Sequence, residues 1–187
     1  VSTHCMPAKT KSIAKKSNEQ QNWYALRTTY GREKKAYDYL VAKGVSAFYP
    51  TIQVMKEIRG QRKVVTESRL PNIFFAFGTE EEIKSYVYDN VNLHEGARIT
   101  KSPLIVPQKQ IEGLKIICES EADDILYVPE EVQKFKEGQM VRVIDGKFKG
   151  LTGRVARYQG QQRVAIIIDG GFTMATAYLP TAFLEYI

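Results

Sequence analysis

The acidic stretch 119–133 constrains the fold most, because it separates two parts of the chain that have different patterns. Its sequence, "ESEADDILYVPEEVQ", carries six carboxylates and no cation, with a proline near its end. Such a composition is typical of a solvated linker. We therefore predict an N-terminal domain over 22–118, an acidic linker over 119–133 and a C-terminal domain over 134–187.

Length and composition agree with two small folded domains. The 187 residues include 43% hydrophobic and 26% charged side chains, which is typical of globular proteins. No apolar run approaches the roughly 20 residues that cross a bilayer, and the first residues lack the apolar stretch of a signal peptide. We expect a cytoplasmic protein with no membrane contact. Residues 1–21 are polar, lysine-bearing and aperiodic, so we predict a disordered basic tail.

The N-terminal domain combines helical and strand patterns. A strand over 22–31 precedes a helix that ends near Gly44. Four short runs rich in β-branched and aromatic residues follow, with "RGQR" (59–62) as a hairpin tip. Two more helices are predicted over 79–90 and 107–118. The domain is predicted to be α+β, an antiparallel sheet flanked by helices.

The C-terminal domain has almost no helical pattern. Four strand-sized runs follow one another at the spacing of a small all-β barrel, and we expect an all-β form. Between the first two lies "DGKFKGLTGRV" (145–155), with three glycines. The favoured interpretation is that these glycines allow sharp turns and close packing; the alternative is that they let a ligand approach the backbone.

The sequence offers little that could carry out catalysis. His4 lies in the tail, and His94 has no cysteine or carboxylate pair at a convincing metal or triad spacing. Neither cysteine suggests pairing or a metal site, and no phosphate-binding loop occurs. We predict no catalytic residues, no metal and no cofactor, and we do not expect an enzyme.

Two sets of motifs resemble a known family. "FKEGQMVRVIDGKFKGLTGRVARYQGQ" (135–161) resembles a KOW motif, the strand-loop-strand unit of the transcription factor NusG and of several ribosomal proteins. "WYALRTTYGREKKAYDYL", "RGQR" and "RLPNIFFAFG" occur in the order and spacing of the NusG N-terminal domain. Together they span 22–187. Asn72 stands where housekeeping NusG has glycine, and "IRGQRKVVTESRLPN" is closer to the specialised paralogues RfaH and UpxY.

The resemblance implies a transcription elongation or antitermination factor acting on surface-polysaccharide (capsular) operons. Its N-terminal domain is then expected to bind RNA polymerase through apolar residues. The candidates are Tyr24, Ile73, Phe75 and Phe77. Period-two alternation places the last three on one face of the sheet and Phe74 on the other. The alternative is that Ile73 and Phe75 are ordinary core residues.

The same resemblance implies contact with the non-template DNA strand at the start of the first helix. The candidates are Tyr30 for stacking, with Arg32, Lys34 and Lys35 for phosphates. A solvated helix face is the alternative. A second basic group at the hairpin tip is a candidate for contact with upstream duplex DNA. The alternative is an exposed hairpin tip with no binding role. Its members are Arg59, Arg62 and Lys63.

The C-terminal domain is expected to recruit a further partner, by resemblance ribosomal protein S10 or termination factor Rho, through strand edges. The KOW loop residues are Gly146, Lys147, Phe148, Lys149, Gly150 and Gly153. We expect a monomer. The alternative function is a KOW-type ribosome or RNA-binding protein, which would not carry the N-terminal motifs.

Overall fold

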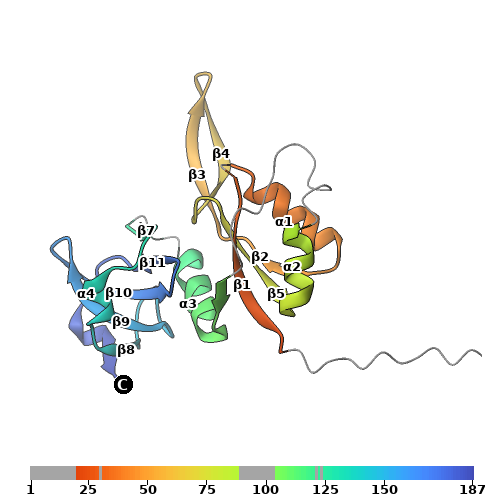
Figure 1. The fold of residues 1–187 in the computed structure, drawn as a ribbon. Helices are drawn as coiled ribbons and strands as arrows, with labels where there is room; N and C mark the ends of the chain where they lie inside the picture. Colours follow the sequence, from red (N-terminus) through yellow and green to blue (C-terminus); the bar gives the residue numbers. More distant parts are fainter. Residues whose placement is uncertain (1–19, 30, 89–103, 121, 123) are drawn as a thin grey trace, which may run out of the picture.

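The computed structural model describes residues 20–29, 31–88, 104–120, 122 and 124–187 (Figure 1). It contains an N-terminal four-stranded sheet, a separate two-stranded hairpin and a C-terminal six-stranded sheet. Within these ranges, no helix is long and apolar enough to cross a membrane. The predicted fold class, an α+β domain followed by an all-β KOW domain, is confirmed.

The N-terminal sheet is antiparallel, with the strand order β2-β5-β1-β6. Its strands are β1 (Asn22–Arg27), β2 (Ser46–Phe48), β5 (Ile73–Gly78) and β6 (Leu104–Val106). Alternate residues point to opposite faces. One face carries Tyr24, Leu26, Phe74 and Ala76, which form a core with buried residues of α1 (Glu33–Ala42) and α2 (Glu80–Tyr88).

A long hairpin projects beyond this sheet (Figure 1). Its strands β3 (Thr51–Ile58) and β4 (Gln61–Ser68) pair over their whole length. The turn uses Arg59 and Gly60, both with positive φ, which suits the tight reversal that the sequence predicts. The hairpin therefore presents its tip away from the rest of the domain.

The C-terminal domain is a small all-β barrel, as predicted. Its strand order is β12-β8-β9-β10-β11-β7. The strands that follow the predicted linker are β8 (Met140–Val143), β9 (Thr152–Tyr158), β10 (Gln161–Ile168), β11 (Phe172–Ala175) and β12 (Leu184–Tyr186). Two short helices, α4 (Gln133–Lys136) and the 3-10 turn η2 (Thr181–Phe183), flank them.

The segment that we predict as a solvated linker contains the sixth strand of this sheet. β7 (Leu126–Val128) pairs with β11 in antiparallel register. β7 contains no charged residue, so it can form a strand although carboxylates lie on both sides of it in the sequence. Residues 124–132, which we call the strap, thus pack on the barrel instead of lying free in solvent.

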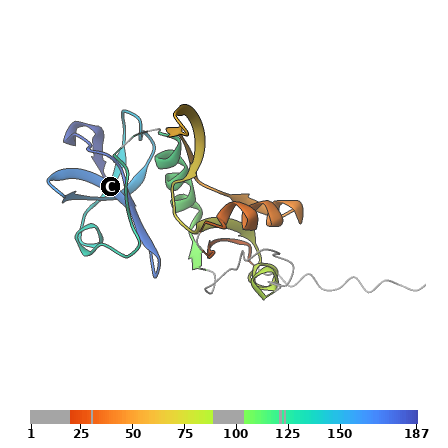
Figure 2. The same ribbon diagram turned by 90° about the horizontal axis from the view of Figure 1, so that it is seen from above.

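The two domains share one hydrophobic core. It joins Ala25 and Phe75 of the N-terminal sheet to Val164 and Phe172 of the barrel. Between them lies α3 (Gln108–Glu119), which separates the sheet from the barrel in both views (Figures 1 and 2). The second face of the sheet is therefore partly covered by α3 and the barrel.

Candidate functional site

The predicted docking residues do not all lie together. Ile73 and Phe75 belong to the core shared with the barrel, and Phe77 packs its ring 5.4 Å from that of Trp23, at the margin of the same core. The predicted alternation of Ile73, Phe75 and Phe77 is therefore confirmed. Tyr24 lies instead in the core with α1 and α2, because it is one position out of phase with them.

Phe75 is fully buried beneath the barrel. Its ring stacks on Phe48 at 5.7 Å between centroids and lies 6.4 Å from Phe172 of β11. Ile73 is 1% exposed. In this arrangement neither residue could contact another protein, and only the half-buried margin of the face is accessible.

That margin contains residues that the sequence analysis missed. Trp23 and Phe48 are half-buried, and the ammonium of Lys115 on α3 lies 5.5 Å and 5.4 Å from their ring centroids. Trp23 Nε1 also donates to Gln108 Oε1 at 2.7 Å. Trp23 could have been found, because it has the same parity as Ala25, which lies opposite Phe75. We call Trp23, Phe48, Phe77 and Lys115 the aromatic margin.

Close contacts hold the barrel against α3 and the sheet. Gly113 makes room for the barrel, since a Cβ at this position would lie 2.5 Å from Ile166 Cδ1. Gln110 Nε2 donates to the Ile167 carbonyl at 3.0 Å, and Arg27 donates to the Gly171 carbonyl at 3.4 Å. The interface is therefore mainly apolar, with few hydrogen bonds.

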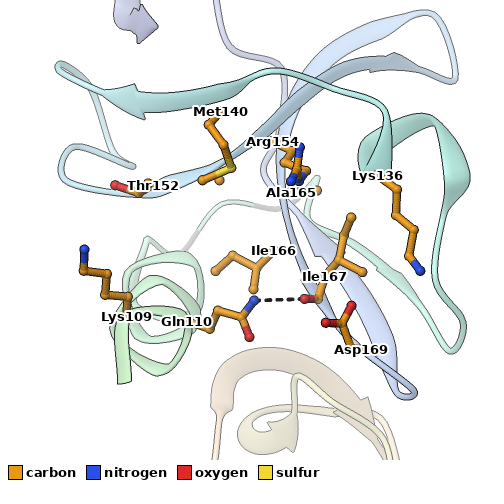
Figure 3. A pocket seen from close by; sticks show the side chains of 11 residues that line it. Lys109, Gln110, Lys136, Met140, Thr152, Arg154, Ala165, Ile166, Ile167 and Asp169 are labelled. Atoms are coloured by element: carbon orange, nitrogen blue, oxygen red, sulfur yellow. Dashed lines mark hydrogen bonds between the residues drawn. The ribbon is translucent and has the colours of Figure 1, made fainter. Parts of the chain in front are cut away.

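A cavity of about 460 Å³ lies along this interface (Figure 3). Lys109 and Gln110 of α3 line one side, while Arg154 and Asp169 of the barrel line the other. Lys136 also reaches it, but this ammonium is paired with Glu131, and that hydrogen bond raises its pKa. Arg154 donates to the Gly138 carbonyl. Two of the cations that line the cavity, Lys136 and Arg154, thus have partners within the chain.

The basic residues at the start of α1 differ in their surroundings. Arg32 is half-buried, whereas Lys34 and Lys35 are exposed. The Lys34 ammonium bonds Asp38 Oδ2 at 2.6 Å, and this hydrogen bond raises the pKa of Lys34. Lys34 is thus partly neutralised by its neighbour one turn away. Tyr30 lies outside the described residues.

The other basic group is well exposed. Arg59, Arg62 and Lys63 lie at or beside the hairpin tip, and Arg62 is paired in register with Glu57. Next to them is an exposed apolar pair, Met55 opposite Val64, 64% and 59% exposed. The structure therefore separates two basic groups, one on α1 and one on the hairpin.

The KOW loop is built for turning and packing. Gly146 and Gly150 have φ of 80° and 92°, which other residues rarely adopt. A Cβ on Gly153 would lie 2.5 Å from the Ala165 carbonyl oxygen. Phe148 is buried in the shared core, while Lys147 and Lys149 are exposed. The glycines thus have the structural role that we favour from the sequence.

Nothing in the described part of the chain suggests catalytic chemistry. No group of three or more His, Cys, Asp or Glu among these residues could hold a metal ion. Burial raises the pKa of Cys118 to about 12, so its thiol stays protonated at neutral pH. His4, Cys5 and His94 lie outside the described residues.

The chain thus combines a mixed sheet-and-helix domain with a small barrel whose turns depend on glycine. Comparison with known proteins identifies its family. The model described as "Transcription termination factor nusG" matches residues 21–115, and the KOW motif model matches 137–169. The chain belongs to the NusG family.

Individual relatives are distant. The transcription termination/antitermination proteins NusG of Streptococcus pyogenes serotypes M3 and M1 are each 24% identical over 175 residues. Each alignment covers 85% of this chain and 93% of the relative. Among solved structures, the one described as "Domain interaction in Thermotoga maritima NusG" matches with a TM-score of 0.42 and 20% identity, covering 90% of this chain and 98% of that chain.

Proposed function

We propose that this chain is a cytoplasmic transcription elongation and antitermination factor that binds RNA polymerase through the second face of its N-terminal sheet. The family match over 21–115 supports this class over a KOW-type ribosomal or RNA-binding protein, since the match includes the domain that such proteins lack. The bond-making steps of transcription remain with the polymerase. This chain supplies binding surfaces and is not expected to be an enzyme.

The observation that carries the proposal is an aromatic face left uncovered by α1 and α2. Trp23, Phe48, Phe75 and Phe77 gather there, and large aromatic side chains are typical anchors of protein interfaces. α3 and the barrel cover part of this face. Binding by Ile73 and Phe75 therefore requires the barrel to separate, whereas the aromatic margin is accessible before separation.

We further propose that the factor is a specialised paralogue of the RfaH and UpxY type acting on surface-polysaccharide operons. The support is the sequence "IRGQRKVVTESRLPN" with Asn72 in place of glycine. The basic groups on α1 and on the hairpin are then expected to contact the non-template strand and the upstream duplex. The KOW barrel is expected to recruit ribosomal protein S10 or Rho.

Polymerase docking can be tested on the full chain with purified bacterial core RNA polymerase by biolayer interferometry. Phe75→Ala is a poor test, because removing a fully buried ring costs about 3–5 kcal/mol of stability. Phe77→Ala removes a half-buried ring and should weaken binding by about 2 kcal/mol, roughly thirtyfold. Gly113→Glu places a carboxylate against Ile166 and should strengthen binding by displacing the barrel.

The matched control is Glu119→Ala, an exposed carboxylate at the last position of the same helix, which should bind like the wild type. Circular dichroism and thermal melting confirm that each variant is folded. The docking proposal is wrong if folded Phe77→Ala binds polymerase as tightly as the wild type. An unchanged affinity of Gly113→Glu would instead refute the requirement for separation.

A further inference from the structure

The cavity between the two domains opens where two strands of the barrel separate. β9 and β10 pair as far as Arg154 opposite Ala165, and in the barrel that the structure describes the rest of β10, up to Ile168, continues without a paired residue on β9. In this gap the Ile167 carbonyl accepts the hydrogen bond from Gln110 Nε2 at 3.0 Å. The first turn of α3 therefore closes one side of a cavity that the barrel leaves open along β10 (Figure 3).

The central part of the cavity is apolar, and its size suits a small molecule. Met140, Arg154 and Ala165 are neighbours on β8, β9 and β10, because each is paired in register with the next. Ile166 and Ile167 extend the apolar lining. The volume of about 460 Å³ lies within the range of small-molecule sites, roughly 300–1,000 Å³, and such sites are common at domain interfaces.

Two cations that line the cavity are available to a ligand. Arg154 is half-buried, and its guanidinium donates to the Gly138 carbonyl at 2.9 Å but has no ion pair in the described part of the chain. Arginine has five N–H donors, so several remain. Lys109 is exposed, and its ammonium has no hydrogen-bond or ion-pair partner among the described residues. Figure 3 shows Met140 and Ile166 between these two cations.

The end of the cavity away from Lys109 is acidic. Lys136 is paired with Glu131, and this hydrogen bond raises the pKa of Lys136. The carboxylate of Asp169 acts on that pKa in the same direction. Two carboxylates thus accompany one ammonium at this end, which favours a ligand group that donates hydrogen bonds over an anionic one.

We propose that this cavity binds a nucleoside monophosphate whose base carries an amino group. The phosphate accepts charge-assisted hydrogen bonds from Arg154 and Lys109. The base packs on Met140 and Ile166, and its amino group donates to Asp169. The ligand contacts α3 and the barrel together, so it stabilises their association. The site is independent of the proposed function, and only its consequence for polymerase docking rests on that function.

The test uses the full chain and isothermal titration calorimetry, with AMP and GMP as probes. Both should bind with dissociation constants below about 1 mM, and at least tenfold more tightly than adenosine, UMP or inorganic phosphate. Adenosine lacks the phosphate, UMP lacks the amino group and inorganic phosphate lacks the base. Weaker binding of both nucleotides, or less than a tenfold preference over any of the three comparison compounds, overturns the proposal.

Variants assign the binding to the two cations. Lys109→Gln and Arg154→Gln should each weaken AMP binding at least tenfold, because each removes a charge-assisted hydrogen bond to the phosphate. Lys134→Gln is the matched control, since Lys134 is exposed on α4, does not line the cavity and carries the same charge. Circular dichroism checks folding, and Lys109→Gln decides the result if Arg154→Gln unfolds. An equal loss of affinity in Lys134→Gln and Lys109→Gln would show diffuse attraction and overturn the site.

A second measurement locates the ligand. In methyl NMR spectra of the chain labelled at methionine, AMP should shift the resonance of Met140 and leave that of Met55, which lies on the hairpin and is 64% exposed. An unshifted Met140 methyl, or equal shifts of the two, overturns the placement. No polymerase is present in these measurements, so their failure leaves the docking proposal standing, and failure of the Phe77→Ala docking test leaves this site standing.

Discussion

Asn72 occupies a backbone conformation that most side chains avoid. Its φ is 65°, in the left-handed region that glycine adopts freely and asparagine tolerates. Its side-chain Oδ1 accepts the Gly31 N–H at 3.2 Å, and its carbonyl accepts the Thr28 N–H at 2.9 Å. Asparagine at this position therefore keeps the turn and adds a hydrogen bond between two loops.

Substitution of Asn72 should separate these two roles. Asn72→Ala imposes the left-handed penalty of about 1–2 kcal/mol and loses the Gly31 bond, whereas Asn72→Gly loses only the bond. We expect Ala to lower the free energy of unfolding by about 1 kcal/mol more than Gly. Urea unfolding followed by the fluorescence of Trp23, the one tryptophan, measures both. Equal losses of unfolding free energy in the two variants would show that the left-handed backbone conformation at this position does not penalise alanine.

At the scale of the elements, we expect the two basic groups to contact different nucleic acids, and this expectation can be tested. Arg32→Ala with Lys35→Ala should reduce binding to single-stranded DNA and lower the log-log salt slope by roughly 0.7 for each phosphate that the variant no longer neutralises. Arg59→Ala with Arg62→Ala should act on duplex DNA, by roughly 0.9 per phosphate. Anisotropy of labelled DNA over a series of salt concentrations measures both slopes.

Lys43→Ala provides the control for this experiment. Lys43 is an exposed cation just beyond the opposite end of α1, where its ammonium lies over the Tyr39 ring. Its removal changes the net charge by one without touching either basic group. If Lys43→Ala changes a slope as much per charge as the paired variants do, the binding is diffuse attraction to a basic protein.

Local patterns predicted most of the elements. Alternation along "NIFFAFG" assigned Phe75 and Phe74 to opposite faces. The helix predicted from Thr79 is present as α2, and Thr79 caps it by accepting the Glu82 N–H at 3.1 Å. These features depend on residues close in sequence. They could therefore be predicted without knowledge of the tertiary structure.

Long-range contacts could not be predicted in this way. Period-two alternation says that Phe75 faces away from Phe74, but not that Phe172, about a hundred positions away, covers it. In the segment 119–133, six carboxylates outweighed the run Ile125–Val128 in our interpretation. The missed signal was Arg163 within a strand of buried residues, since such a cation needs a partner.

At the scale of the whole molecule, the strap bears on where the C-terminal domain begins. We predict that a fragment 120–187 is more stable than a fragment 134–187, because the shorter one loses β7 and the counter-charge of Arg163. A difference of 1 kcal/mol shifts the melting temperature of a domain this small by about 4–8 °C. Circular dichroism melting of the two fragments should therefore differ by at least several degrees.

A fragment carrying Asp124→Asn within 120–187 is the matched control, and it should melt between the other two. Equal melting temperatures for 120–187 and 134–187 would restore the predicted boundary at 134 and make the strap energetically neutral. Both fragments should give β-type spectra, since the barrel strands other than β7 all lie after 134.

The strap also determines the length of the free linker between the two domains. Four residues separate Glu119, where α3 ends, from Asp124, where the strap is anchored. Fully extended, four residues span about 14 Å, so a barrel released from the sheet would remain within that distance and at high effective concentration. If the strap detaches from β11, the linker extends from Glu119 to the start of α4 at Gln133. Its length then increases to about 45 Å, at roughly 3.3–3.6 Å per residue. If the N-terminal domain binds polymerase as proposed, detachment of the strap would thus increase the distance over which the barrel can move away from it.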